Sequence, residues 1–110
     1  MPDPATMPSP ASPVITDAPE RERYEAHLDS ELAGILEYVH KRERIALIHT
    51  EVLPIHEGRG VGSALVRFAL DDARRRGLRV IATCPYVQGY LTRHPEDDDI
   101  VLGRGGATRD

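Results

Sequence analysis

The sequence has few of the residues that form disulfides or large aromatic cores. Its 110 residues include one cysteine, one phenylalanine and no tryptophan. A single cysteine cannot form an internal disulfide, so the chain needs no oxidising compartment and we expect a cytoplasmic protein. With 40% hydrophobic residues, the length suits one small domain whose core consists of Val, Ile, Leu and Ala with a few tyrosines.

An excess of positive charge is also lacking. The net charge of -4 at pH 7 gives no electrostatic reason to bind nucleic acid, because phosphate neutralisation needs a basic face. The densest basic run, 74–76, follows Asp71 and Asp72 and precedes Gly77, which is typical of the last turn of a helix. The five histidines show no metal-site spacing, so we expect no metal.

Long apolar runs are missing as well, above all from the amino-terminal segment. That segment has no basic n-region, so we expect neither a signal peptide nor a membrane anchor. Six of the nine prolines fall within the first twenty residues, and proline removes donors from any backbone ladder. We therefore expect a disordered tail over 1–13, one folded domain over 14–102 and a flexible Gly-rich tail over 103–110.

Alternating apolar and polar residues predict strands in the first half of the chain. Residues 20–28 and 31–41 read as a hairpin joined by a two-residue turn. Residues 44–53 carry Ile or Leu on both faces in their first half, which predicts a central strand covered on two sides. The same alternation places these side chains on one face: Ile45, Leu47, His49 and Glu51.

The period becomes helical after this strand. Residues 60–76 form one apolar stripe, and 78–84 read as a short strand. A strand, crossover helix and strand of this length favour parallel pairing with a right-handed crossover. A short helix over 86–94 follows, and 97–102 form either a last strand fragment or a docking segment.

Three glycines stand between the central strand and this helix, namely Gly58, Gly60 and Gly62. The first turn of a helix leaves N–H groups free, its dipole favours negative charge, and absent Cβ atoms let a phosphate approach the main chain. The loop lacks the Lys of a P-loop, and Ser63 and Leu65 stand where the dinucleotide fingerprint needs glycine. The sequence therefore predicts an anion-binding loop of another type.

Such a loop, of the form Arg/Gln-x-x-Gly-x-Gly/Ala, holds pyrophosphate in the GNAT acetyltransferase superfamily, and this sequence resembles it in "EGRGVG" followed by "SALV". The sequence is also similar to a small single-domain subfamily in "HTEV", "CPYV" and "RHPE". The resemblance implies an α/β, GNAT-like fold: a mixed sheet with antiparallel N-terminal strands and a β-α-β acyl-CoA-binding unit. It also implies that the loop amides hold the pyrophosphate of acetyl-CoA and that the preceding strand pairs with pantetheine.

The resemblance carries over to cofactor-binding positions residue by residue. Glu57 replaces Arg or Gln, so we expect its side chain to point elsewhere, with Arg59 as a compensating charge. Arg93 is a candidate partner of a CoA phosphate, although surface exposure is the other reading. The expected set is Val52, Leu53, Glu57, Gly58, Arg59, Gly60, Val61, Gly62, Ser63, Cys84, Tyr90 and Arg93.

Acetyl transfer also needs a base for the amine and an acid for the departing thiolate. Cys84 could receive the acetyl group as a nucleophile or line the pocket as a small hydrophobe. Tyr86 and Tyr90, four apart on a helix, could protonate the thiolate or pack on the sheet. His49 and Glu51 could act as a base pair or line a polar sheet face.

The leading functional prediction is an N-acetyltransferase that moves an acetyl group from acetyl-CoA to an amine of a small molecule or protein. We expect a monomer or homodimer that binds neither nucleic acid nor membrane. The alternative is an acyl-CoA-binding module with little turnover, because no room remains between the first two strands for the helices that shape the family's acceptor pocket. A third reading, a nucleotide-phosphate binder, predicts that ATP or GTP binds as tightly as CoA.

Overall fold

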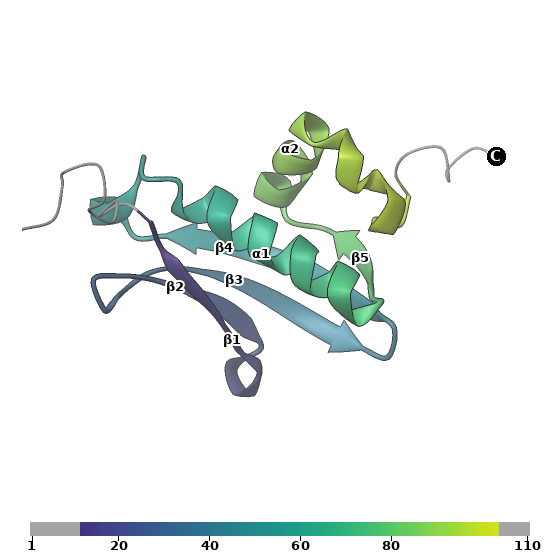
Figure 1. The fold of residues 1–110 in the computed structure, drawn as a ribbon, viewed down its shortest axis with the longest axis horizontal. Coiled ribbons are helices and arrows are strands. Elements are labelled where there is room, and N and C mark those ends of the chain that lie inside the picture. The colour runs from purple at the N-terminus through teal and green to yellow at the C-terminus, as the bar shows by residue number, and fades with distance from the viewer. Residues whose placement is uncertain (1–11, 104–110) are drawn as a thin grey trace, which may run out of the picture.

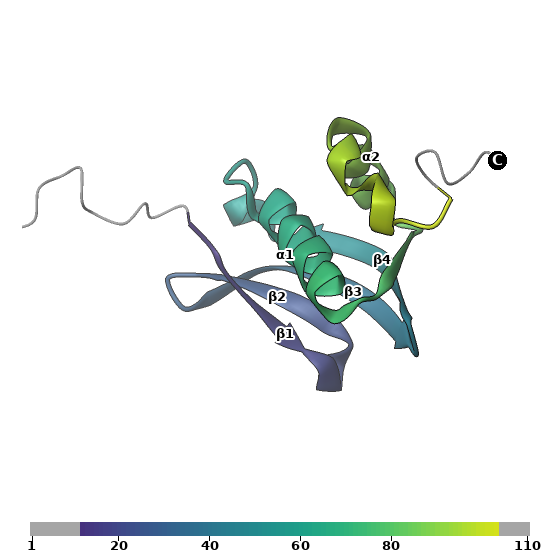
Figure 2. The same cartoon turned by 45° about the vertical axis from the view of Figure 1, so that its right-hand side comes forward.

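A computed structural model describes residues 12–103, so the tails expected over 1–13 and 103–110 lie almost wholly outside it. Five strands form one sheet in the order β1-β2-β3-β4-β5. Figures 1 and 2 show both α-helices on the same side of this sheet. The bounds are β1 Val14–Ala18, β2 Arg23–Leu28, β3 Glu31–Lys41, β4 Arg44–Val52, α1 Val61–Arg76, β5 Arg79–Ala82 and α2 Pro85–Arg93.

The sheet is mixed, as the sequence predicts. Strands β1 to β4 pair antiparallel, and β4 pairs parallel with β5 through the α1 crossover. The β2–β3 hairpin turns at Asp29 and Ser30, whose φ angles of 50° and 69° are the left-handed pair of a type I′ turn. The predicted α/β, GNAT-like arrangement of antiparallel strands followed by a β-α-β unit is confirmed.

Element boundaries differ from the prediction in three places. Strand β1 was not expected, because it is a short edge strand with only Ala18 buried and so carries little apolar alternation. The strand expected from residue 20 starts at Arg23, after the 3₁₀ turn Pro19–Arg21. Strand β5 ends at Ala82 because the next two amides both donate to the Leu47 carbonyl.

The hydrophobic core lies between α1 and the sheet. Leu65, Ala69 and Ala73 are fully buried there, which confirms the predicted apolar stripe of this helix. Gly77 ends α1 with φ of 72°, in the left-handed conformation that glycine adopts without strain. The buried residues of the sheet beneath include Tyr24, Leu36, Ile45, Leu47 and Val80.

The opposite face of the sheet carries no helix within residues 12–103. Ala46 is only half-buried and Ile48 is 41% exposed. The prediction that the central strand is covered on both sides is therefore wrong, because both helices of the described chain pack on one side. The apolar residues Ala46 and Ile48 of β4 therefore lie on a sheet face that no helix of the described residues covers.

A β-bulge in β4 changes which side chains share a face. Tyr38 lies opposite Leu47 but Glu37 lies opposite His49, so Ile48 is the extra residue. Beyond the bulge, His49 and Glu51 lie on the open face. Their predicted placement with Ile45 and Leu47 is therefore wrong, because an inserted residue inverts the alternation from that point on.

The segment after α2 docks on α1. Arg67 of α1 donates to both carboxylate oxygens of Asp97 at 2.8 and 2.9 Å, and Asp97 is only 2% exposed. Residues Pro95–Ile100 form a 3₁₀ helix, and Val101 makes an isolated parallel bridge to Val80. The segment is thus both a docking segment and a minimal addition to the sheet.

This ion pair predicts acid sensitivity. The Arg67 guanidinium holds the pKa of Asp97 below its usual range, so the stabilisation is fully present above the unfolded-state pKa of about 3.9 and is lost as pH falls through the lower folded-state pKa. We expect Asp97→Asn to lower the free energy of unfolding at pH 7 by about 2 kcal/mol, measured by urea denaturation. The difference in the free energy of unfolding between parent and variant should become smaller below about pH 4.

Asp71→Asn is the matched control, because Asp71 binds the same arginine from an exposed position. It should change the free energy of unfolding by less than about 0.5 kcal/mol. Equal losses in the two variants would contradict the role of Asp97.

Candidate functional site

The glycine loop has the backbone that anion binding requires. Gly58 and Gly60 have φ angles of 82° and 78°, a region that residues with a Cβ rarely adopt. Gly60 is the N-cap of α1, and no side chain of the described residues caps this helix start. The first-turn amides therefore have neither an intrahelical nor a side-chain acceptor. A Cβ at either glycine would meet no atom within 4 Å, so the space in front of the loop is open.

A hollow of about 380 Å³ lies against this loop. It brings together several of the predicted cofactor-binding residues, on the α1 side of the sheet. Other predicted residues, namely Leu53, Arg59, Ser63, Cys84, Tyr90 and Arg93, are not part of its lining. The lining consists of Thr50, Val52, Glu57, Gly58, Gly60, Val61, Gly62 and Tyr86.

Tyr86 covers the third glycine. A Cβ built on Gly62 would lie 2.7 Å from the phenol oxygen, so this position is glycine because of close approach. The phenol oxygen lies 3.2 Å from the Ser63 hydroxyl, and the residue is 42% exposed. The Tyr86 ring therefore lies over the start of α1 and forms part of the wall of the hollow.

Cys84 does not line this hollow but contacts Thr50, which does. Its sulfur is 3.4 Å from the Thr50 hydroxyl, at the N-cap of α2, and the residue is 3% exposed. Burial raises the pKa of the thiol, but hydrogen bonds from the Thr50 hydroxyl and from the backbone amides of Val87, Tyr86 and Thr50 outweigh this and lower the pKa. The thiolate is stabilised by amides at a helix start, which replace the basic side chains that the sequence does not place nearby.

The lowered pKa can be measured directly. Because Cys84 is the chain's one cysteine, absorbance at about 240 nm follows its ionisation alone at pH values below tyrosine ionisation. We expect a midpoint below the usual thiol value of about 8.5, and a higher midpoint in Thr50→Val, which removes a hydrogen bond to the thiolate. Cys84→Ser supplies the blank. A midpoint that Thr50→Val leaves unchanged would contradict the assignment.

The other predicted catalytic residues lie apart from this hollow. The His49 and Glu51 side chains approach to 3.4 Å, but they lie on the open face, across the strand from Thr50. Tyr90 is buried, stacks on His94 with ring centroids 4.1 Å apart and accepts a hydrogen bond from Arg67 at 3.4 Å. The structure thus places Tyr86 against the glycine loop and Cys84 against Thr50, and it leaves Tyr90 in a packed position.

Two residues of this region were missed by sequence reasoning. Thr50 contacts Cys84 and lines the hollow, but the unseen bulge placed it on the wrong face. His56, just before the glycine loop, is buried with no hydrogen-bond partner for Nδ1 in the described residues. Its position between a proline and a glycine is a turn signal that conceals its burial.

Within residues 12–103, no cluster of three or more His, Cys, Asp or Glu side chains could hold a metal ion. None of the helices described is long and apolar enough to cross a membrane.

Comparison with known proteins agrees with the geometry. Protein NATD1 of Homo sapiens is 39% identical over 61 residues, which cover 56% of this chain and 53% of that protein. Streptothricin acetyltransferase of Streptomyces lavendulae is 38% identical over 63 residues, covering 56% of this chain and 33% of that protein. The chain thus spans about half or less of the length of these relatives.

The fold also has a solved counterpart. A GCN5-like protein from Staphylococcus aureus, solved by NMR, superposes with a TM-score of 0.65 at 21% identity, over 87% of this chain and 94% of that chain. The family described as GCN5-related N-acetyl-transferase matches residues 23–100, from β2 through the segment that docks on α1. By its matched sequence and its fold, this chain belongs to the GCN5-related N-acetyltransferase family.

Proposed function

We propose that this protein transfers an acetyl group from acetyl-CoA to an amine. The observation that carries the proposal is that Thr50 connects the glycine loop with Cys84. Thr50 lines the hollow in front of the start of α1, and its hydroxyl lies 3.4 Å from the Cys84 sulfur. A pyrophosphate site and a polarised thiol are thus joined by the end of one strand. The name of one relative, streptothricin acetyltransferase, supports acetyl transfer as the reaction class.

The donor would be held mainly by backbone groups. The amides at Gly60 and Gly62 suit the pyrophosphate, because a helix start favours anions and glycine leaves room for them. Arg59 is exposed beside them and would add a positive charge. In the described residues, pairing with β5 ends at Leu47, so Thr50 and Val52 would offer backbone groups to an extended pantetheine chain as a neighbouring strand would.

The chemistry we propose uses Cys84 and Tyr86. The Cys84 thiolate attacks the thioester carbonyl, its sulfur gains the acetyl group, and the carbon–sulfur bond to CoA breaks. Tyr86 gives its phenol proton to the departing CoA thiolate and recovers a proton from the incoming ammonium. The free amine then attacks the acetyl-cysteine, which releases the amide and the Cys84 thiolate, and the second amine proton passes to solvent. Tyr90, packed against His94 and Arg67, is a positioning residue for α2.

Calorimetric titration with acetyl-CoA, followed by CoA release from a panel of amines, tests the proposal. We expect saturable acetyl-CoA binding that ATP and GTP do not match, together with amine-dependent CoA release. An absence of acetyl-CoA binding in a folded parent would overturn it, and equal affinity for ATP would favour a nucleotide-phosphate binder.

One observation favours a second function, an acyl-CoA-binding module with little turnover. Strands β2 and β3 are joined by only Asp29 and Ser30, so no helix from this connection covers the acceptor side. Tight acetyl-CoA binding without CoA release on any amine of the panel would select this function.

A further inference from the structure

The open face of the sheet carries three types of side chain in an ordered sequence. Ile45, Leu47 and Val80 are buried on the α1 side, so their neighbours along each strand point to the open face. Residues paired across strands point to the same face. The cationic row is Lys41, Arg44 and Arg79; the apolar row is Val39, Ala46 and Ile81; and the carboxylate cluster is Glu37, His49 and Glu51.

The cationic row is unusual because it places like charges side by side. Arg44 is directly paired with Lys41 on β3 and with Arg79 on β5, and like charges in such pairs destabilise a sheet. Arg79 donates to the Asp99 backbone carbonyl at 3.2 Å and forms no ion pair with a carboxylate in the described residues, although its charge contributes to lowering the pKa of Asp99. An acidic protein thus concentrates positive charge at one end of an open face.

Several arginines elsewhere in the described residues form ion pairs with carboxylates, but the cations at this end of the open face do not. Within residues 12–103, Lys41, Arg42 and Arg44 form no ion pair. The arginines that do pair with carboxylates are Arg21, Arg23, Arg67, Arg74, Arg75 and Arg76. Arg59 and Arg93 also form no ion pair in the described residues, but Lys41, Arg42 and Arg44 lie next to one another, so an anion from outside would relieve their repulsion.

Arg42 adds a second departure from the expected pattern. It occupies the two-residue turn between β3 and β4 with φ of 51°, a left-handed conformation that is unfavourable for a residue with a Cβ. Glycine or asparagine is the usual residue in such a turn. This strain, next to the cationic row, makes the Arg42 side chain a candidate for recognition.

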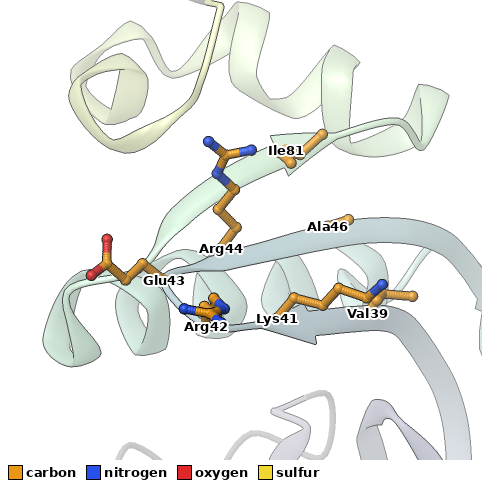
Figure 3. Close-up of a pocket in the computed structure, with 7 residues that line it drawn as sticks. All are labelled: Val39, Lys41, Arg42, Glu43, Arg44, Ala46 and Ile81. Atoms are coloured by element: carbon orange, nitrogen blue, oxygen red, sulfur yellow. The ribbon is translucent and has the colours of Figure 1, made fainter.

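The apolar row lines a hollow of about 530 Å³ together with Lys41 and Arg44 of the cationic row and with Arg42 and Glu43 of the adjacent turn (Figure 3). Half-buried Val39, Ala46 and Ile81 supply its apolar part, while Lys41 and Arg44 are exposed. Side chains two residues apart on a strand are about 6.6 Å apart, which is also the repeat of an extended peptide. A peptide lying along β4 can therefore place an acidic side chain at the cationic row and an apolar one at the apolar row.

The carboxylate cluster lies where the next alternate residue would fall. Glu37 and His49 follow Val39 and Ala46 in the strand register, and Glu51 lies within 3.4 Å of His49. Arg23, paired with Glu37 across β2, has its charge matched by Glu25 at 2.8 Å. Negative charge at this place attracts an ammonium group, and β4 here has passed its last pair with β5.

We propose that the acetyl acceptor is a lysine amine on an extended acidic peptide, of the pattern acid-x-apolar-x-lysine, that docks on this open face. Because it names the acceptor class, the inference rests on the proposed acetyl transfer. The acid meets the cationic row, the apolar side chain enters the hollow, and the ammonium is held at the carboxylate cluster on the open face. Thr50 and Cys84 lie on the opposite face of β4, so the amine reaches the acetyl group past the end of the β4–β5 pairing at Leu47.

Fluorescence anisotropy of labelled pentapeptides tests docking separately from catalysis. The probes are Glu-Ser-Leu-Ser-Lys, its charge-swapped form Lys-Ser-Leu-Ser-Lys, and Glu-Ser-Ser-Ser-Lys, which lacks the apolar side chain. We expect the parent to bind the first probe about tenfold more tightly than the second and several-fold more tightly than the third at low salt. Mass spectrometry with acetyl-CoA present should show the lysine of the first probe acetylated fastest.

Three variants connect the selectivity to named side chains. Arg44→Gln and Arg42→Gly should each weaken binding of the first probe about two- to fivefold. Arg42→Gly should leave the midpoint of urea unfolding unchanged or higher, because glycine relieves the left-handed strain. Arg75→Gln, which removes one positive charge from the end of α1, should leave peptide affinity unchanged.

Equal binding of the acidic and charge-swapped probes by the parent, or equal losses in Arg75→Gln and Arg44→Gln, would overturn the proposal. Acetyl-CoA titration of the same samples separates it from the proposed function. Selective peptide binding without acetyl-CoA binding would overturn acetyl transfer and the acceptor role while supporting the docking surface. Acetyl-CoA binding without peptide selectivity would overturn the docking surface alone.

Discussion

The Gly60→Asn variant should bind acetyl-CoA, and the Gly60→Asp variant should bind it at least about tenfold more weakly than Gly60→Asn does. The two side chains have nearly the same shape, and Asn and Asp tolerate the left-handed conformation better than other residues with a Cβ, which matters at φ of 78°. A Cβ here meets no neighbouring atom, so either side chain enters the open space before α1. Only the aspartate places a negative charge where the pyrophosphate is expected.

Calorimetric titration of both variants and the parent measures this difference, with circular dichroism as the check on folding. The asparagine variant controls for strain and bulk, so the ratio between the variants isolates charge. Raising the salt concentration should reduce that ratio, because exposed charges are screened. Equal affinities of the two variants would show that the anion does not bind at the start of α1.

Cys84→Ala should lower the rate of amine acetylation by at least about 100-fold. The parent mixed with acetyl-CoA alone should gain about 42 Da, the mass of one acetyl group, and peptide mapping should place it on Cys84. The variant should bind acetyl-CoA and gain no mass, because its glycine loop is intact. Stopped reactions analysed by mass spectrometry measure the adduct and the product together.

The pH dependence gives this prediction an independent check. Since the fold lowers the pKa of Cys84, the parent's rate should rise with pH through that lowered value and then level off. Thr50→Val should move the rise to higher pH and leave the plateau rate similar, because it removes a hydrogen bond to the thiolate. Full acetylation activity in Cys84→Ala would instead indicate direct transfer from donor to amine.

Local patterns in the sequence were sufficient for the elements that depend on neighbouring residues. The helical stripe ending at Gly77, the turn at Asp29 and Ser30, and the glycines before α1 are each specified by periodicity or by a conformation that few residues accept. The parallel β4–β5 pair follows from the length of its crossover. The mixed sheet and the place of the loop were therefore predictable.

Residues whose roles depend on contacts distant in the sequence were not predictable in the same way. Thr50 and Cys84 are 34 residues apart, and their contact depends on the bulge at Ile48, which has no periodic signal. The open face was predicted as covered because an apolar strand pattern does not say which helices will pack on it. The packing of Tyr90 depends on Arg67, which lies on α1, and on His94, which lies one helical turn further along the chain.

The sequence by itself determined the order of the elements from β2 to α2 and the bare backbone at the start of α1, because propensity, periodicity and glycine conformation act over a few neighbouring residues. Only the tertiary structure decided which side chains meet. It brought Thr50 and the α2 amides to Cys84, and it aligned Lys41, Arg44 and Arg79 in one row, because register and bulges are set by packing across the sheet.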